Sequence, residues 1–330
     1  MASALAGERE PVSDLRAVAA RALIAGIYYP WRATEKVLGR SLGCVVHSHH
    51  LLRDVFRSFG DSWPVSVEYP NVVDGAHSLR LQLDLCQTTQ LWYFRDRGRY
   101  EPALMQLLAK AIGDASCFVD VGAHFGLFAM TIAQACPGKR VVAIEPAPET
   151  VAALRRHLSL NGLDSIEVRA TAIASAGAET VYYRNPLNDG GGGLEPADEY
   201  RSGERRIPVA DYLGQHPEFA PTVTVRSCRL DSLIDEPCVI KIDVEGRELD
   251  VLESAEQLFA AGHVRVMVVE VWAGHLDAIV GYLDRFDIDC FRAGLDRPLR
   301  AGDVMARRIL NIVCVHRRLA NGQALMGMLA

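Results

Sequence analysis

Four acidic residues of this 330-residue chain each stand at the end of a short apolar run. They are Asp120, Glu145, Asp243 and Glu270. Continuous apolar runs are typical of buried parallel strands, and the carboxyl ends of such strands form the edge of a sheet where open α/β folds bind ligands. We therefore expect these carboxylates to meet in one crevice, where they could hold hydroxyl groups or cations, or accept a proton.

The residues after Asp120 indicate which ligand suits this crevice. The segment 117–130 reads as strand, tight turn and helix, with Gly122 and Gly126 freeing the backbone of the turn. A dinucleotide fingerprint has the pattern G-x-G-x-x-G, and His124 stands where that pattern has its middle glycine. Because the Cβ of His124 would obstruct a pyrophosphate, the loop favours a nucleoside without a diphosphate, such as S-adenosylmethionine.

Glu145 and one further carboxylate, Glu101, have candidate roles in binding. Glu145 follows Asp120 by twenty-five residues. In βαβ nucleotide folds an acid at the end of the second strand commonly binds ribose hydroxyls, and the alternative is a solvated acid at a strand end. Glu101 stands where a helical pattern begins, so that it could complement the helix dipole or close over a cationic ligand.

An α/β framework is needed to position these residues, and the order of the patterns along the chain predicts one. Helices are expected over 103–112, 150–160 and 275–285, with Asn161-Gly162 ending the second. The predicted sheet is mostly parallel, with an antiparallel pair at the end of the chain. Its expected strands cover 117–121, 140–146, 165–171, 238–242, 264–271, 287–292 and 309–316, while 179–184 and 222–230 have strand character between the two halves.

The segments outside this framework have more than one interpretation. Residues 15–27 predict a helix that is too short, and too interrupted by Arg16 and Arg21, for a membrane span of about 18 residues. Its apolar face could pack on its own domain, touch a membrane or join a second subunit. The alternation over 64–85 predicts a β-hairpin. The histidines of 47–50 could bind metal, although a solvated turn or helix start is favoured. The glycine-rich loop 188–194 could be a surface linker or a lid.

The composition of the chain indicates which class of acceptor and which cell compartment to expect. The net charge is −6 and no Lys/Arg-rich run occurs, so the electrostatic footprint of a nucleic-acid binder is missing and a small or neutral acceptor is expected. The eight cysteines form no C-x-x-C pair, which favours a reducing cytoplasm.

A set of motifs connects these features to a known family. Their order resembles that of the FkbM-type S-adenosylmethionine-dependent O-methyltransferases, over about residues 90–272 and on toward residue 316. The motifs are R-Y-E-P (99–102), F-V-D-V-G-A-H-F-G (118–126), A-I-E-P (143–146), L-N-G-L (160–163), R-L-D-S-L (229–233), K-I-D-V-E-G-R-E-L-D-V-L (241–252) and V-V-E-V (268–271). Residues 1–63 match nothing in that family.

The resemblance implies a Rossmann-like seven-stranded methyltransferase sheet at residues 96–320, preceded by a helix and hairpin extension (1–95) and followed by a tail (321–330). It also implies methylation of a hydroxyl on a sugar, glycolipid or polyketide-type secondary metabolite. At position 124 the family usually has Asn. The cofactor site is expected to contain Glu101, Asp120, Gly122, Ala123, His124, Gly126, Glu145, Asp243 and Glu245.

A positioned acceptor hydroxyl still benefits from a base, and Asp243, Glu270 and His275 are the candidates. Carboxylates on adjacent strands also resemble the magnesium site of catechol-type methyltransferases, which the family pattern does not require. Two weaker alternatives are a nicotinamide-dependent oxidoreductase, opposed by the missing glycine, and a non-catalytic nucleoside-binding protein.

Overall fold

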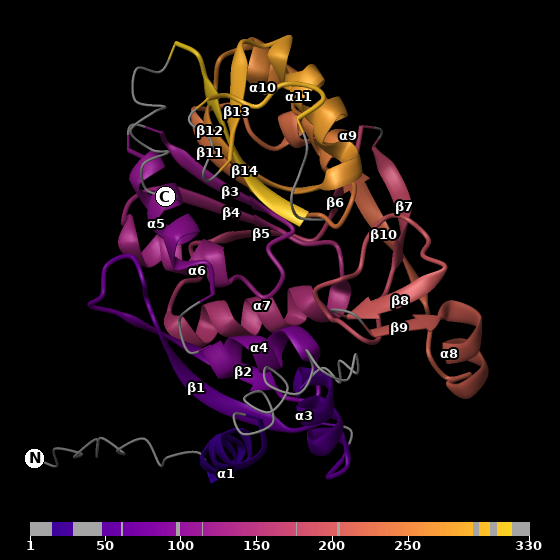
Figure 1. Ribbon diagram of the computed structural model, residues 1–330. Helices are drawn as coiled ribbons and strands as arrows, with labels where there is room; N and C mark the ends of the chain where they lie inside the picture. Colours follow the sequence, from indigo (N-terminus) through magenta and orange to yellow (C-terminus); the bar gives the residue numbers. More distant parts are fainter. Residues whose placement is uncertain are drawn as a thin grey trace, which may run out of the picture. The chain divides into compact units, whose positions relative to one another are not determined.

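The structure is a computed structural model that describes residues 15–28, 48–60, 62–96, 100–113, 115–175, 177–202, 205–292, 297–303 and 309–318 (Figure 1). The chain divides into two compact units. The first comprises Met1–Glu68 and Arg80–Arg97, and the second comprises Tyr69–Leu79 and Gly98–Ala330. Each unit is described by itself.

The first unit is built from short helices and most of a hairpin. Helix α1 (Leu15–Leu23) continues as a π-helical turn (Ile24–Tyr28), and α3 (Ser48–Arg57) precedes the paired strands β1 (Pro64–Pro70) and β2 (Ser78–Asp84). The predicted hairpin is confirmed, and alternate leucines of β2 are buried. His47 lies outside the described residues, as do the side chains of His49 and His50. The hypothesis that this cluster binds metal therefore concerns side chains outside the described part of the chain.

Helix α4 (Thr88–Asp96) follows the hairpin in sequence. Its residues Thr88, Leu91 and Phe94 are buried, and their spacing of three residues places them on one side of the helix.

The second unit contains the main sheet. Among the described residues it has seven strands, in the order β13-β14-β12-β11-β3-β4-β5. The strands from β12 to β5 pair in parallel, and β14 is antiparallel to both neighbours. This confirms the predicted α/β class and the antiparallel end. The bounds are β3 Cys117–Val121, β4 Arg140–Ile144, β5 Glu167–Arg169, β11 Cys238–Ile242, β12 Val264–Trp272, β13 Ile288–Phe291 and β14 Ile309–His316.

Helices cover both faces of this sheet (Figure 1). Alternate strand residues such as Val119, Ile240 and Val269 form one core with residues of α9 (Glu248–Glu253), α10 (Glu256–Ala260) and α11 (Leu276–Asp284). The opposite face lies under α5 (Pro102–Ala111), α6 (Leu127–Ala135) and α7 (Pro148–Asn161). Helix α7 ends at Gly162 in the left-handed conformation, as its sequence predicted.

Between β5 and β11 the chain makes smaller elements. Strands β6 (Ala172–Ile173), β10 (Thr222–Cys228) and β7 (Ala178–Tyr183) form a three-stranded sheet, followed in sequence after β7 by the hairpin β8 (Glu199–Ser202) and β9 (Arg205–Pro208) and by α8 (Val209–Gln215). The strand expected at 165–171 is therefore shorter in the main sheet, because the chain leaves it after Arg169 and pairs with β10 from Ala172. Within the described ranges no helix is both long and apolar enough to cross a membrane.

Candidate active site

The turn after β3 has the predicted form and depends on its first glycine. Gly122 has φ +80°, and a Cβ there would lie 1.8 Å from the backbone oxygen of Asp243. The amides of Gly122 and Ala123 both donate to the Ile144 carbonyl, and the Asp243 amide donates to the Val121 carbonyl. The ends of β3, β4 and β11 are thus joined by backbone contacts, and only glycine fits at their junction.

Asp120 occupies the buried end of β3. Its side chain is 1% exposed, and Oδ2 accepts a hydrogen bond from the Ala129 amide at 3.2 Å. Burial raises the pKa of Asp120 to about 6. The Lys241 ammonium and the hydrogen bond from Ala129 oppose this rise, and the nearby Asp243 carboxylate adds to it. The other oxygen, Oδ1, has no hydrogen-bond partner among the described residues.

Glu145 accepts hydrogen bonds from the turn after β3 and from the residues that follow β4. Its Oε2 accepts from the amide of His124 and its Oε1 from the amide of Ala147, both at 3.0 Å. Burial raises the pKa of Glu145, but bonds to both oxygens are the arrangement of an ionised carboxylate, and each oxygen keeps a second acceptor site. The carboxylate can therefore hold further hydroxyl donors without losing its own position.

Lys241 is a site residue that the sequence reasoning missed. It lies in the apolar run of β11, where its register partner on β3 is Asp120. Its Nζ is 3.0 Å from Asp243 Oδ2, 3.9 Å from Asp120 Oδ1 and 4.7 Å from the centre of the Phe128 ring. Burial disfavours the ammonium, yet these carboxylates raise the pKa of Lys241 above its usual value. The signal in the sequence was a lysine inside a strand otherwise made of buried apolar residues.

Glu101 faces β14 and does not cap its own helix. Its backbone is in the left-handed region, at φ 44° and ψ 48°, without a side-chain cap bond at the start of α5. Instead Oε1 accepts from Asn311 Nδ2 at 2.9 Å, and Asn311 is the register partner of Glu270. Asn311 is a second residue that sequence reasoning missed. Burial raises the pKa of Glu101, and burial together with Asp243 and Glu245 raises the pKa of Glu270 to about 9.

Glu245 and His275 are the two remaining predicted site residues near the turn after β11. Burial, together with Asp243 and Glu248, raises the pKa of Glu245 to about 8. His275, whose side chain is 42% exposed, lies with Nδ1 3.4 Å from Glu248 Oε2. The other carboxyl oxygen of Glu248 accepts from the Gly246 amide at 2.7 Å. The structure therefore pairs His275 with Glu248.

The glycine-rich loop 188–194 packs on these turns. Asp189 Oδ2 is 3.5 Å from His124 Nε2, and Gly193 pairs with Tyr183 through two backbone hydrogen bonds. A Cβ at Gly193 would lie 3.5 Å from the backbone oxygen of Glu245. The loop thus borders the turns that carry His124 and Glu245.

The described residues contain no group of three or more His, Cys, Asp or Glu side chains placed to hold a metal ion.

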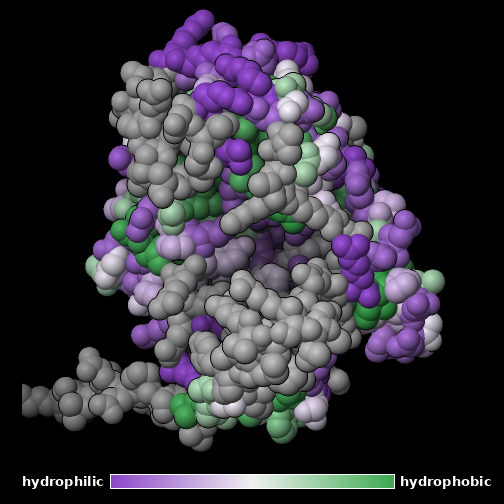
Figure 2. All heavy atoms as spheres, in the orientation of Figure 1, coloured by the Kyte–Doolittle hydropathy of each residue, from purple (hydrophilic) through white to green (hydrophobic). Residues whose placement is uncertain are grey.

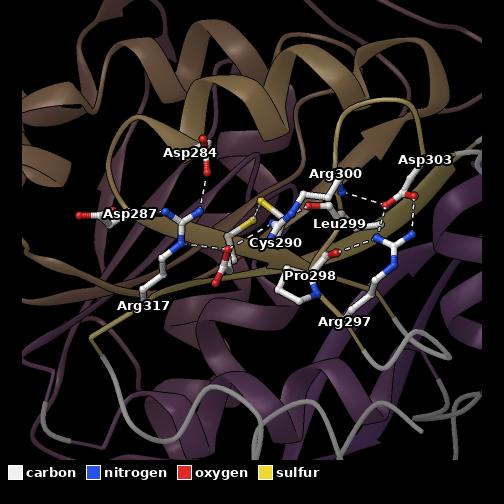
Figure 3. A network of polar contacts seen from close by, with 11 residues as sticks. Asp284, Asp287, Cys290, Arg297, Pro298, Leu299, Arg300, Asp303 and Arg317 are labelled. Carbon is white, nitrogen blue, oxygen red and sulfur yellow. Dashed lines mark hydrogen bonds and ion pairs between the residues drawn. The ribbon is translucent and has the colours of Figure 1, made fainter.

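Figure 3 shows a separate polar network, in which Arg317 bonds to Asp284 and Asp287 and Arg297 bonds to Asp303. Figure 2 shows that hydrophilic residues gather over α10 and α11 near this network. These exposed ion pairs include none of the predicted site residues and contribute little to stability.

Two curated proteins with similar sequences are methyltransferases by name. "Methyltransferase 1" of Beauveria bassiana is 26% identical over 148 residues, covering 43% of this chain and 59% of that protein. "Methyltransferase sdnD" of Sordaria araneosa is 28% identical over 173 residues, covering 47% and 65%. The matched region therefore spans less than two thirds of either fungal protein.

Among solved structures, the O-methyltransferase from Bacillus cereus in complex with SAH aligns over 86% of this chain and 97% of its own, at 15% identity and a TM-score of 0.32, a likeness on which no conclusion rests. The family model "Methyltransferase FkbM domain" matches residues 120–288, from the end of β3 to the start of β13 and more than half of the chain. The chain belongs to the FkbM methyltransferase family.

Proposed function

We propose that the protein transfers the methyl group of S-adenosylmethionine to a hydroxyl group of a small molecule. The observation that carries this proposal is the double anchoring of Glu145 by the amides of His124 and Ala147. It leaves a fixed carboxylate beside a glycine turn at the edge of a parallel sheet, an arrangement suited to ribose hydroxyls. Asp120 Oδ1, which lacks a hydrogen-bond donor among the described residues, suits the ammonium of the methionine moiety.

When bound, the cofactor would supply an activated sulfonium methyl group. The residues of the chain would hold the acceptor oxygen in line, exclude water and take up its proton. Asp243 is our first candidate for the proton acceptor, since it ends β11 beside the cofactor turn and Lys241 bonds only to its Oδ2. Glu270 is a weaker candidate, because a carboxyl with a pKa of about 9 is protonated at neutral pH and would donate a hydrogen bond.

The charges of the site support an uncharged acceptor. Glu101, Glu245 and Glu270 all have raised pKa values because burial and neighbouring carboxylates disfavour their ionised forms. The buried cation near them, Lys241, already pairs with Asp243. The burial that disfavours the ionised forms of these groups would also disfavour an anionic acceptor, whereas the hydroxyls of a sugar, glycolipid or polyketide-type metabolite can hydrogen-bond to carboxyl groups.

Calorimetry with S-adenosylhomocysteine tests cofactor binding. The reaction is tested by incubating the protein with S-adenosylmethionine and a set of neutral hydroxyl compounds, and by measuring the S-adenosylhomocysteine that is formed. With an acceptor in hand, we expect Asp243→Asn to lower kcat by about 10²-fold or more while cofactor affinity changes little. Near-normal turnover of this variant would contradict the role of Asp243. Activity lost to EDTA and restored by magnesium would favour the catechol-type alternative.

A further inference from the structure

We propose that Lys241 is a positioning residue whose ammonium keeps Asp120 ionised while it also bonds to Asp243, so that the cofactor end and the reacting end of the site share one counter-ion. This inference rests on the proposed function, because it assumes that ionised Asp120 binds the cofactor. Lys241 itself is not expected to touch the reacting atoms.

The sheet fixes the position of this ammonium. Lys241 and Asp120 are register partners on adjacent parallel strands, so their side chains leave the same face of the sheet. Phe128 of α6 closes this space, with its ring 4.7 Å from Nζ. The lysine side chain is 6% exposed and that of Asp120 is 1% exposed, so water screens their interaction little. Nζ therefore stays between the two carboxylates.

Asp120 needs this cation more than Asp243 does. One oxygen of Asp120 accepts from the Ala129 amide, and the other, which has no hydrogen-bond partner within the described part of the chain, lies 3.9 Å from the ammonium. Asp243 has a quarter of its side chain exposed and a direct bond to Nζ at 3.0 Å. A buried carboxylate with one hydrogen bond is costly, so removing the ammonium would favour protonation of Asp120.

The neighbouring charges predict the direction in which the pKa of Asp120 should move when each of them is removed. Lys241 lowers the pKa of Asp120, whereas Asp243 raises it. Loss of the lysine charge and loss of the Asp243 charge must therefore move the titration of Asp120 in opposite directions. The titratable groups that face Lys241 come from β3, the end of β11 and the start of α5, and they are Asp120, Asp243, Tyr100 and Glu101. Glu245 and Glu270 also interact with its charge.

The test is the affinity for S-adenosylhomocysteine, measured by calorimetry from pH 5 to pH 8.5. In the unmodified protein we expect the affinity to fall on acidification with a midpoint near pH 6, the pKa of Asp120. Lys241→Met should raise this midpoint by about one pH unit, so that binding near pH 6 weakens by about fivefold. Asp243→Asn should lower the midpoint, and Lys241→Arg, which keeps the charge, should restore it toward the original value.

Asp120→Asn identifies the titrating group, because its weaker binding should no longer depend on pH over this range. An unchanged midpoint in Lys241→Met, or a shift of Lys241→Met and Asp243→Asn in the same direction, would overturn the inference and leave cofactor binding intact. If Lys241→Met does not fold, as judged by its thermal transition, the Asp243→Asn variant tests the inference: a lower midpoint supports it, and an unchanged or higher midpoint contradicts it. Absence of binding by the unmodified protein at every pH would instead refute the proposed function, and this inference with it.

Discussion

At the scale of single residues, the anchoring of Glu145 leads to a prediction about binding. Glu145→Gln keeps the size of the side chain, but its amide nitrogen cannot accept from a backbone amide, so either His124 N or Ala147 N loses its acceptor. We expect S-adenosylhomocysteine to bind more weakly by about 1.5–3 kcal/mol, the usual contribution of a hydrogen bond to a charged group. Isothermal titration calorimetry measures this change.

Glu167→Gln is the matched control for that experiment. Glu167 lies on the adjacent strand β5 and pairs with Arg140 and Arg169 at positions that are partly exposed. This variant should bind the cofactor product normally. Unchanged affinity in Glu145→Gln would remove Glu145 from the cofactor site.

The same residues show what sequence alone could establish about the site. Asp120 and Glu145 were predicted because each directly follows an apolar run. The end of a strand can be recognised in this way without knowing which strands pair. Lys241 and Asn311 were missed because they lie inside β11 and β14. Their roles depend on which strands are neighbours and in which register, and this information is distributed over distant parts of the chain. The cofactor and catalytic assignments stay predictions until binding is measured.

At the scale of elements, the glycine loop can be tested with two neighbouring substitutions. A Cβ at Gly192 would lie 2.2 Å from the hydroxyl of Tyr182, a buried residue that packs with Ala147 and Val225. Gly192→Ala must therefore displace the loop or the tyrosine, and we expect a loss of about 1–3 kcal/mol in the free energy of unfolding. Chemical denaturation followed by tryptophan fluorescence measures it.

Gly193→Ala provides the comparison within the same loop. Its new Cβ would lie at ordinary contact distance, 3.5 Å from the Glu245 oxygen, so its stability should stay within about 0.5 kcal/mol of the unmodified protein. Equal effects of the two substitutions would contradict the packing described for this loop.

Prediction of elements succeeded where one periodicity was sustained. The hairpin of β1 and β2 and the strand 309–316 follow their patterns closely. Prediction failed where tertiary pairing decided: the chain leaves the main sheet at Arg169 to pair Ala172 with Ser227, a partner more than fifty residues away. No local pattern reports a change of sheet.

At the scale of the whole molecule, the buried acids predict how stability depends on pH. An acid whose pKa is higher in the folded protein than in the unfolded chain stabilises the fold below the unfolded value and loses this effect as pH rises through the folded value. Glu270 moves from 4.5 to about 9 and Glu245 from 4.5 to about 8. The free energy of unfolding should therefore fall between pH 5 and pH 9, by at most about 1.4 kcal/mol per pH unit for each group.

Glu270→Gln isolates one contribution, because glutamine resembles the protonated acid and does not ionise. Its thermal unfolding temperature should fall less steeply with pH than that of the unmodified protein. Glu218→Gln, at a side chain that is 76% exposed, should leave the slope unchanged. A slope in Glu270→Gln equal to that of the unmodified protein would show that Glu270 ionises normally in the fold.

The contact between Gly122 and the backbone of Asp243 has a consequence for the synthesis of the protein. Strand β4 follows β3 at once, but β11, the other neighbour of β3, leaves the ribosome more than a hundred residues later. Until then the turn at Gly122 lacks the backbone against which it closes, and Asp120 lacks its counter-ion. The nascent chain therefore cannot close the turn at Gly122 before β11 is made, and a product truncated before residue 238 would contain most of the proposed binding residues without the means to arrange them.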